Sequence, residues 1–202
     1  MHVTRTFGLL AAALSTLLVT ACGTAAPPSS PAASSPESAT VVAAGHNEAD
    51  ITFVQGMIPH HEQAVVMSQL AADRAASPRV KELAATIEQA QAPEIEQMRG
   101  FLEAWGVEED SSMGGMDHGS MGQGGMPGMM SGQQMGGLDR ANGAGFDRMF
   151  LQMMVVHHEG AVTMARTELA DGQNPQAKAL AQAIIDQQTA EIAQMQELLK
   201  TV

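Results

Sequence analysis

The chain has 202 residues and a formal net charge of −12, from 10 basic and 22 acidic side chains. This charge argues against nucleic acid as a partner and against an electrostatic hold on anionic lipid, since both are negatively charged. Aromatic residues make up only 3% and tyrosine is absent, which disfavours stacking on bases or sugars, whereas the 16 methionines are unusual for a chain of this size.

The first 22 residues are predicted to be a bacterial lipoprotein signal. Arg5 supplies a positive start, and the apolar run from Leu9 to Val19 is too short to span a membrane. The run leads into Val19-Thr20-Ala21-Cys22-Gly23, which resembles a lipobox, so Cys22 is expected to be lipidated. An ordinary secretory signal cleaved near Ala21 or Ala25 is the alternative. We therefore expect an exported protein, held by its lipid alone on the outer face of the cytoplasmic membrane, at the cell surface or in the periplasm.

Residues 23–49 are rich in Pro, Ser, Ala and Thr and are predicted to be a disordered tether. Such a composition buries too little apolar surface to offset the entropy lost on ordering. The remaining residues, 50–202, are enough for one compact domain.

This domain is a duplication. Residues 50–102 align without a gap on residues 147–199, with 21 identities in 53 positions and a constant offset of 97. The shared positions include a Met-x-x-His-His-Glu motif and, farther on, a Gln-x-x-Glu-x-x-x-Met motif. A repeat of this length indicates two copies of one supersecondary unit.

Each copy is predicted to be an antiparallel helical hairpin. Apolar residues recur at intervals of three and four, and Asp50 can cap the first helix. Pro59 lies inside that helix, which we expect to remain one helix with a weak point. Ser-Pro or Asn-Pro begins the second helix of each copy. The prediction is an all-α four-helix bundle with hairpins at 50–106 and 147–202.

A long Met/Gly-rich connection, residues 107–146, joins the second and third helices. Seven methionines lie between Met113 and Met135, and a short helix is expected from a cap at Ser131 to Ala141. Methionines in a Gly-rich connection have no core to fill, which favours soft-metal binding, with a low-complexity linker as the alternative. The candidates here are Met113, Met116, His118, Met121, Met126, Met129 and Met130.

The paired histidines are expected at one level of the bundle core. Counting from the turn between the first two helices places Glu94 level with His60 and His61, and Glu191 has the same relation to the second pair. Adjacent helical residues point about 100° apart, so His60 and His157 should face the core and the other two a neighbouring helix or the rim.

Two interpretations of this layer remain open. Histidine and glutamate could satisfy each other across each hairpin, because buried polar groups are costly unless paired. A duplicated set in an apolar core favours a metal site instead, with Glu94 and Glu191 as candidate ligands. Imidazole and carboxylate would suit iron, zinc or manganese, whereas thioether sulfur selects Cu(I), which we favour.

These motifs resemble the domain of unknown function 305 (DUF305) family. The resemblance covers about residues 46–202 and is carried by Met57-Ile58-Pro59-His60-His61, its counterpart from Met154 to Ala161, the Gln-x-x-Glu-Ile-x-x-Met of both second helices, and Met126 to Met130. Members are exported, ferritin-like four-helix bundles, some of them copper-binding proteins or metallochaperones. The resemblance implies copper ligands at Met57, His60, His61, Met98, Met154, His157, His158 and Met195.

We therefore expect a non-catalytic protein that buffers Cu(I), supports copper tolerance, or passes copper to a transporter or another copper protein. One alternative is a ferritin-like redox protein with a di-iron or di-manganese carboxylate centre, although the sequence lacks the Glu-x-x-His pair of such sites. The other is a structural surface lipoprotein whose core histidines are satisfied.

Overall fold

The computed structural model describes residues 45–110 and 126–202, which belong to one compact unit. The predicted signal and Cys22, most of the predicted tether, and the candidates Met113, Met116, His118 and Met121 lie outside the described residues.

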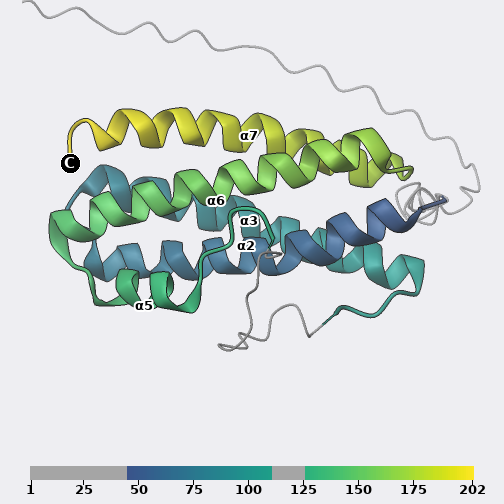
Figure 1. Cartoon of the computed structure of the whole chain (residues 1–202), viewed down its shortest axis with the longest axis horizontal. Helices are drawn as coiled ribbons and strands as arrows, with labels where there is room; N and C mark the ends of the chain where they lie inside the picture. The colour runs from purple at the N-terminus through teal and green to yellow at the C-terminus, as the bar shows by residue number, and fades with distance from the viewer. Residues whose placement is uncertain (1–44, 111–125) are drawn as a thin grey trace, which may run out of the picture. The chain divides into compact units, whose positions relative to one another are not determined.

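The described part of the chain is helical (Figure 1). It contains α2 (Glu48–Arg74), α3 (Pro78–Trp105), α5 (Gly132–Arg140), α6 (Gly143–Asp171) and α7 (Pro175–Leu199). The four long helices form the hairpins α2–α3 and α6–α7, which pack together mainly through α2 against α6. The predicted all-α four-helix bundle is confirmed, and α5 is the short helix expected in the connection. None of these helices is long and apolar enough to cross a membrane.

Two helices begin earlier than predicted. The N-cap of α2 is Asn47, whose side chain accepts hydrogen bonds from the backbone of Ala49 and Asp50. Asp50 is therefore not the cap but the third helical residue, and its carboxylate accepts a hydrogen bond from the Asn47 N–H in a capping box. The ordered domain thus extends before residue 50. In the same way α6 begins at Gly143 rather than at 147, while α2 runs unbroken through Pro59 as predicted.

A buried aspartate from one hairpin holds the turn of the other. Asp147, near the start of α6, accepts hydrogen bonds from the N–H groups of Ala76 and Ser77 in the α2–α3 turn, at 3.1 and 2.9 Å. The Ser77 hydroxyl itself makes no capping hydrogen bond to α3. We call the contact of Asp147 with this turn a latch.

A second latch lies at the other end of the bundle. Asp50 accepts hydrogen bonds from the N–H groups of Gln173 and Asn174 in the α6–α7 turn, the shorter being 2.8 Å. Acceptor and donors each lie 97 residues from their counterparts in the first latch. The two hairpins are therefore related by an approximate twofold symmetry, which makes α2 and α6 antiparallel and places the paired histidines near their midpoints.

Glu168 on α6 is buried beside the second latch. Burial first, and then the adjacent Asp50 carboxylate, raise the pKa of Glu168 from 4.5 to about 8. The folded protein binds the Glu168 proton more tightly than the unfolded chain does, so protonation of Glu168 stabilises the fold. This contribution to the free energy of unfolding is complete below pH 4.5 and is lost as pH rises to about 8.

We expect Glu168→Gln to remove most of this pH-dependent loss of stability, because the glutamine amide stays neutral at all these pH values. At about 1.4 kcal/mol per pKa unit, the wild type should lose a few kcal/mol of unfolding free energy over that range that the variant keeps. Urea unfolding at pH 5.5 and 8.5 measures the difference. The exposed Glu159→Gln is the matched control, and equal pH slopes for wild type and Glu168→Gln would contradict the expectation.

The apolar core consists of two clusters, one on each side of the histidine layer. Met57 and Met98 belong to the cluster that contains Phe53, and Met154 and Met195 to the cluster that contains Phe150. The two methionines of each copy therefore belong to the same cluster, and the level of Met57 with Met98 stays a prediction. All four methionines are fully buried.

Candidate metal centre

Four imidazoles lie together where α2 crosses α6. His60, His61, His157 and His158 have no exposed surface. The rings of His60 and His157 are in contact, with centroids 3.8 Å apart and planes inclined at 41°. These are the two histidines that the helical count directed at the core, and the approximate twofold symmetry explains why they meet.

The outer histidine of each pair contacts a carboxylate on the partner helix of its own hairpin. His61 Nε2 lies 2.9 Å from Glu94 Oε2, and His158 Nε2 lies 2.7 Å from Glu191 Oε2. In metal centres, a ligating histidine commonly donates its second N–H to such a carboxylate, which orients the ring. The structure thus places Glu94 and Glu191 to orient imidazoles, and their role as direct ligands stays a prediction.

A backbone carbonyl contacts the third ring. His60 Nε2 lies 3.1 Å from the oxygen of Pro127. Pro127 belongs to the segment Met126–Ser131, which precedes α5 and which we call the strap. Because a carbonyl can only accept, the hydrogen of the neutral His60 ring must be on Nε2, which leaves a lone pair on Nδ1.

Five ring nitrogens in this layer have no hydrogen-bond partner among the described residues. They are Nδ1 of each of the four histidines and Nε2 of His157. The buried amides of Gln91 and Gln188, which are equivalent in the two copies, also leave atoms unpaired within the described part of the chain. Buried polar atoms are nearly always satisfied, so such a cluster needs an explanation.

The two central imidazoles are held neutral. Burial, with a smaller contribution from His61, lowers the pKa of His60 to about 3. Burial also lowers the pKa of His157 well below its ordinary value, and the neighbouring histidines add to this effect. Metal ligation requires the neutral ring with a free lone pair, so no proton has to be displaced at neutral pH.

The donor set fits a soft cation better than a hard one. Among residues 45–110 and 126–202, no three His, Cys, Asp or Glu side chains converge as a ready metal site. A hard cation such as Mg²⁺ or Ca²⁺ would need about six oxygen ligands, whereas imidazole and the flanking thioethers suit copper. The donor types present, imidazole nitrogen and thioether sulfur, are therefore ones that suit copper.

The strap brings three loop candidates to the bundle. A Cβ built on Gly56 would lie 3.5 Å from Met126 Sδ, so this sulfur is beside α2 one turn before His60. Met130 is buried in the cluster with Phe150, whereas Met129 is half-buried. In the sequence these three belong to the Met-rich tract, and no pattern there predicts that the strap docks on the helices.

Comparison with known proteins identifies the family. Residues 50–199 match the family described as "Domain of unknown function (DUF305)". The chain belongs to the DUF305 family. The resemblance predicted from the motifs is thereby confirmed.

Solved structures of DUF305 proteins share this fold. A DUF305 protein from Streptomyces coelicolor, named as secreted, is 36% identical, with a TM-score of 0.67 over 75% of this chain and 92% of that one. CopM in its Cu(II)-bound form is 32% identical, with a TM-score of 0.65 over 75% and 95% of the two chains. CopM has also been solved with Cu(I), with silver and without metal.

A curated relative matches a shorter stretch. The protein L153 of Acanthamoeba polyphaga mimivirus is 41% identical over 54 residues, which is 27% of this DUF305 chain and 36% of that protein. The match therefore covers about a third of that relative's length.

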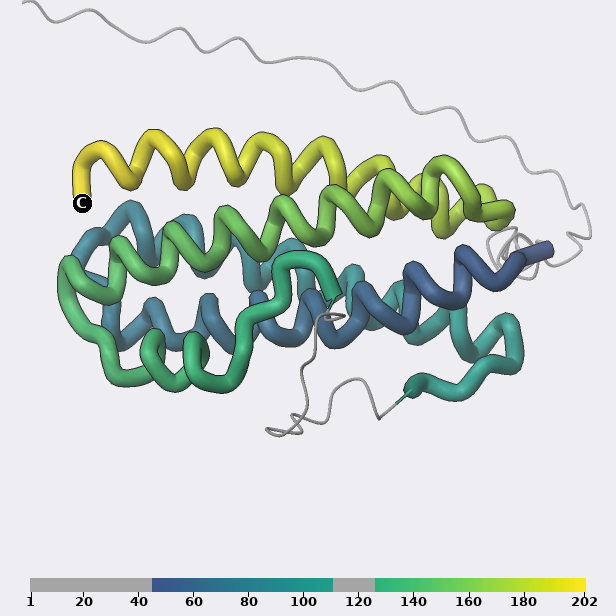
Figure 2. The backbone as a smooth tube through the Cα atoms, viewed as in Figure 1, coloured from purple at the N-terminus to yellow at the C-terminus, as the bar shows by residue number. Residues whose placement is uncertain are grey.

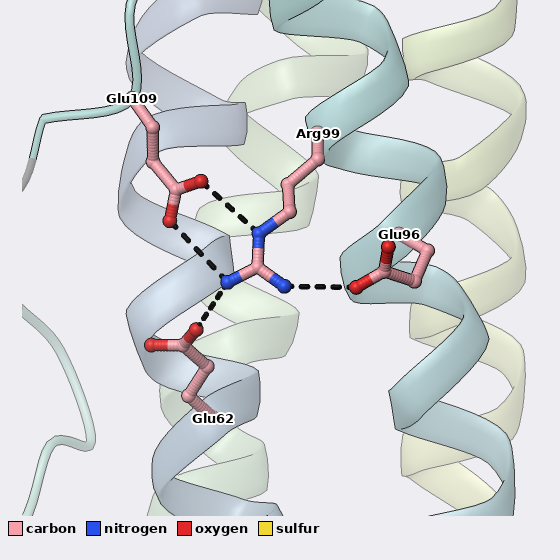
Figure 3. A network of polar contacts seen from close by, with 4 residues as sticks. All are labelled: Glu62, Glu96, Arg99 and Glu109. Carbon is pink, nitrogen blue, oxygen red and sulfur yellow. Dashed lines mark hydrogen bonds and ion pairs between the residues drawn. The ribbon is translucent and has the colours of Figure 1, made fainter.

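The glutamate that follows each His-His pair is not part of the layer in this DUF305 domain. Glu62 pairs with Arg99 of α3 at 2.6 Å, and Arg99 is also bound by Glu96 and Glu109 (Figure 3). Glu62 therefore contacts a neighbouring helix and not the histidine layer. Its counterpart Glu159 is exposed, because the second copy has a glutamine in place of Arg99.

Proposed function

We propose that this DUF305 protein binds copper as cargo, with Cu(I) preferred, and either buffers it or passes it to another copper protein. No catalytic step is proposed. The observation that carries the proposal is the layer of four buried imidazoles, in which five ring nitrogens lack a partner within the described part of the chain. The copper-bound and silver-bound forms of CopM support it, because the two folds agree and the chains are about 30% identical.

Copper would be held first by the imidazoles. Nδ1 of His60, His61 and His158 and either nitrogen of His157 carry the available lone pairs. The second set of candidates consists of the thioethers above and below the layer, Met57, Met98, Met154 and Met195, together with Met126, Met129 and Met130 of the strap region. Thioether ligands favour Cu(I), which is the basis of our preference for that oxidation state.

The alternatives account less well for the layer. A carboxylate-bridged di-metal centre would need Glu94 and Glu191 as ligands, yet each contacts the Nε2 of an outer histidine. A purely structural histidine layer should be satisfied internally, yet four Nδ1 atoms are buried without a partner among the described residues.

The site of action is proposed to be outside the cytoplasm. The predicted signal and Cys22 would export the protein and anchor it by lipid, and the Streptomyces relative named as secreted supports export. A copper transporter or another extracytoplasmic copper protein would then be the delivery partner.

We expect the tag-free mature protein to bind Cu(I) under reducing conditions and to compete with a Cu(I) chelator. Free Cu(I) at 100 times its dissociation constant should raise the free energy of unfolding by roughly 2.7 kcal/mol. Titration with metal analysis and urea unfolding measure both. Tight binding of iron or manganese with oxygen-dependent turnover would favour the di-metal alternative, and no metal-dependent stabilisation would favour the structural one.

A further inference from the structure

The strap is clamped to α2 by one buried side chain. Gln63 accepts a hydrogen bond from the Met130 N–H at 2.7 Å and donates one to the Met130 carbonyl at 2.9 Å. Both bonds are buried, so they satisfy the polar atoms of that strap residue where water cannot. Gln63 lies on the helical turn that follows His60.

The strap also contacts the backbone of α6. A Cβ on Gly160 would lie 2.1 Å from the Pro127 oxygen, and a Cβ on Gly128 would lie 2.8 Å from the carbonyl oxygens of Val156 and His157. Gly128 also has a positive φ of 81°, which favours glycine. The strap can therefore sit here only because both positions lack a side chain.

The two anchors occupy equivalent positions in the repeat. Gly160 lies 97 residues after Gln63, at a point where the copies differ directly after His-His-Glu. Gln63 in the first copy binds the strap, and Gly160 in the second copy leaves room for it. A single strap can therefore lie across an otherwise symmetric pair of helices. Figure 2 shows this segment rising from α5 to the middle of the bundle.

The seated strap acts on the histidine layer. It brings the Pro127 carbonyl to His60 Nε2, which sets the tautomer of that ring. His60 has no exposed surface, and the strap backbone also lies against the carbonyl of His157, the ring's partner in the core. The strap thus touches both central histidines, one through its ring and one through its backbone.

We infer that Gln63 and Gly160 are positioning residues that seat the strap over the layer, and that the seated strap fixes His60 with Nδ1 free and limits the rate of copper exchange. This inference rests on the proposed function. Copper would enter and leave when the strap lifts, and the lifting must break the Gln63 clamp.

The test compares two Gly→Ala variants of the full chain. Gly160→Ala places a methyl group against Pro127, whereas Gly100→Ala on α3 meets nothing within 4 Å. We expect Gly160→Ala to lose hydrogen-exchange protection at the Met130 amide and to transfer Cu(I) to a chelator at least about tenfold faster, corresponding to about 1.4 kcal/mol. Gly100→Ala should behave as wild type in both measurements. Gln63→Leu, which removes both hydrogen bonds to Met130, should repeat the effect.

The His60 tautomer gives a readout that needs no copper. Nitrogen NMR of the metal-free protein should show Nε2–H in wild type and a mixture of tautomers in Gly160→Ala and Gln63→Leu. The inference is overturned if the strap stays protected in both variants, or if it is released while the tautomer and the transfer rate remain those of wild type. Failure of the wild type to bind Cu(I) would refute the proposed function and, with it, the exchange role. The tautomer would still report whether the strap positions His60.

Discussion

Replacing His157 with leucine is expected to stabilise the metal-free protein and to weaken Cu(I) binding at the same time. Neither ring nitrogen of His157 has a hydrogen-bond partner among the described residues, and the ring is fully buried. An unsatisfied buried polar group costs about 1–3 kcal/mol, so a leucine of similar size should raise the free energy of unfolding by about that amount. Loss of a direct ligand should lower the affinity at least about 100-fold, because changing a residue that only orients a ligand already costs about 10–100-fold.

Stability of the metal-free protein and affinity for Cu(I) are expected to change in opposite directions, so this variant distinguishes a metal ligand from a packing residue. If His157 served only packing, its replacement would lower the free energy of unfolding and leave the affinity for Cu(I) unchanged. Urea unfolding of the metal-free protein and chelator competition measure the two effects. His46→Leu is the control, because His46 stacks on Trp105 at 4.8 Å, away from the layer, and should leave the affinity unaltered. A destabilised His157→Leu with wild-type affinity would refute the metal centre.

The second large effect is expected at the Asp147 latch. Asp147→Ala removes a buried carboxylate that accepts hydrogen bonds from Ala76 and Ser77. Hydrogen bonds to charged groups contribute about 1.5–3 kcal/mol each, and water can partly replace them at this turn, so we expect the free energy of unfolding to fall by about 2–4 kcal/mol. Thermal and urea unfolding with a circular-dichroism readout measure the change.

Two comparisons test the latch further. Asp139→Ala breaks an exposed ion pair with Arg74 and should cost less than about 1 kcal/mol. Asp50→Ala opens the equivalent latch at the other end of the bundle, and the two losses should add within about 0.5 kcal/mol because the sites share no partner. If Asp147→Ala proves no worse than Asp139→Ala, the latch does not hold the hairpins together.

The histidine layer was predictable because its determinants are local. Helical period and the count from a short turn are enough to put His60 level with Glu94, and the repeat gives the same relation for His157 and Glu191. In the structure, Glu94 and Glu191 contact the adjacent histidines His61 and His158. The rings of His60 and His157 point inward and meet, as expected.

The sequence patterns do not predict the two latches, although the repeat contains both of their aspartates. Asp50 and Asp147 are identical in the two copies, but an aspartate before a helical pattern is also a common cap, and that local interpretation was chosen for Asp50. The acceptors bind N–H groups about 70 and 123 residues away in sequence. No periodicity within one helix reports a contact over that separation.

The sequence by itself determined the duplication, the four long helices and the level at which the histidines meet, since all of these follow from spacing along one chain. Only the tertiary structure decided that Glu94 and Glu191 lie on the Nε2 side of the outer imidazoles, that Pro127 sets the tautomer of His60, and that Gln63 and Gly160 seat the strap. Ring orientation and strap docking depend on the packing of α2 against α6, which spacing within either helix does not specify.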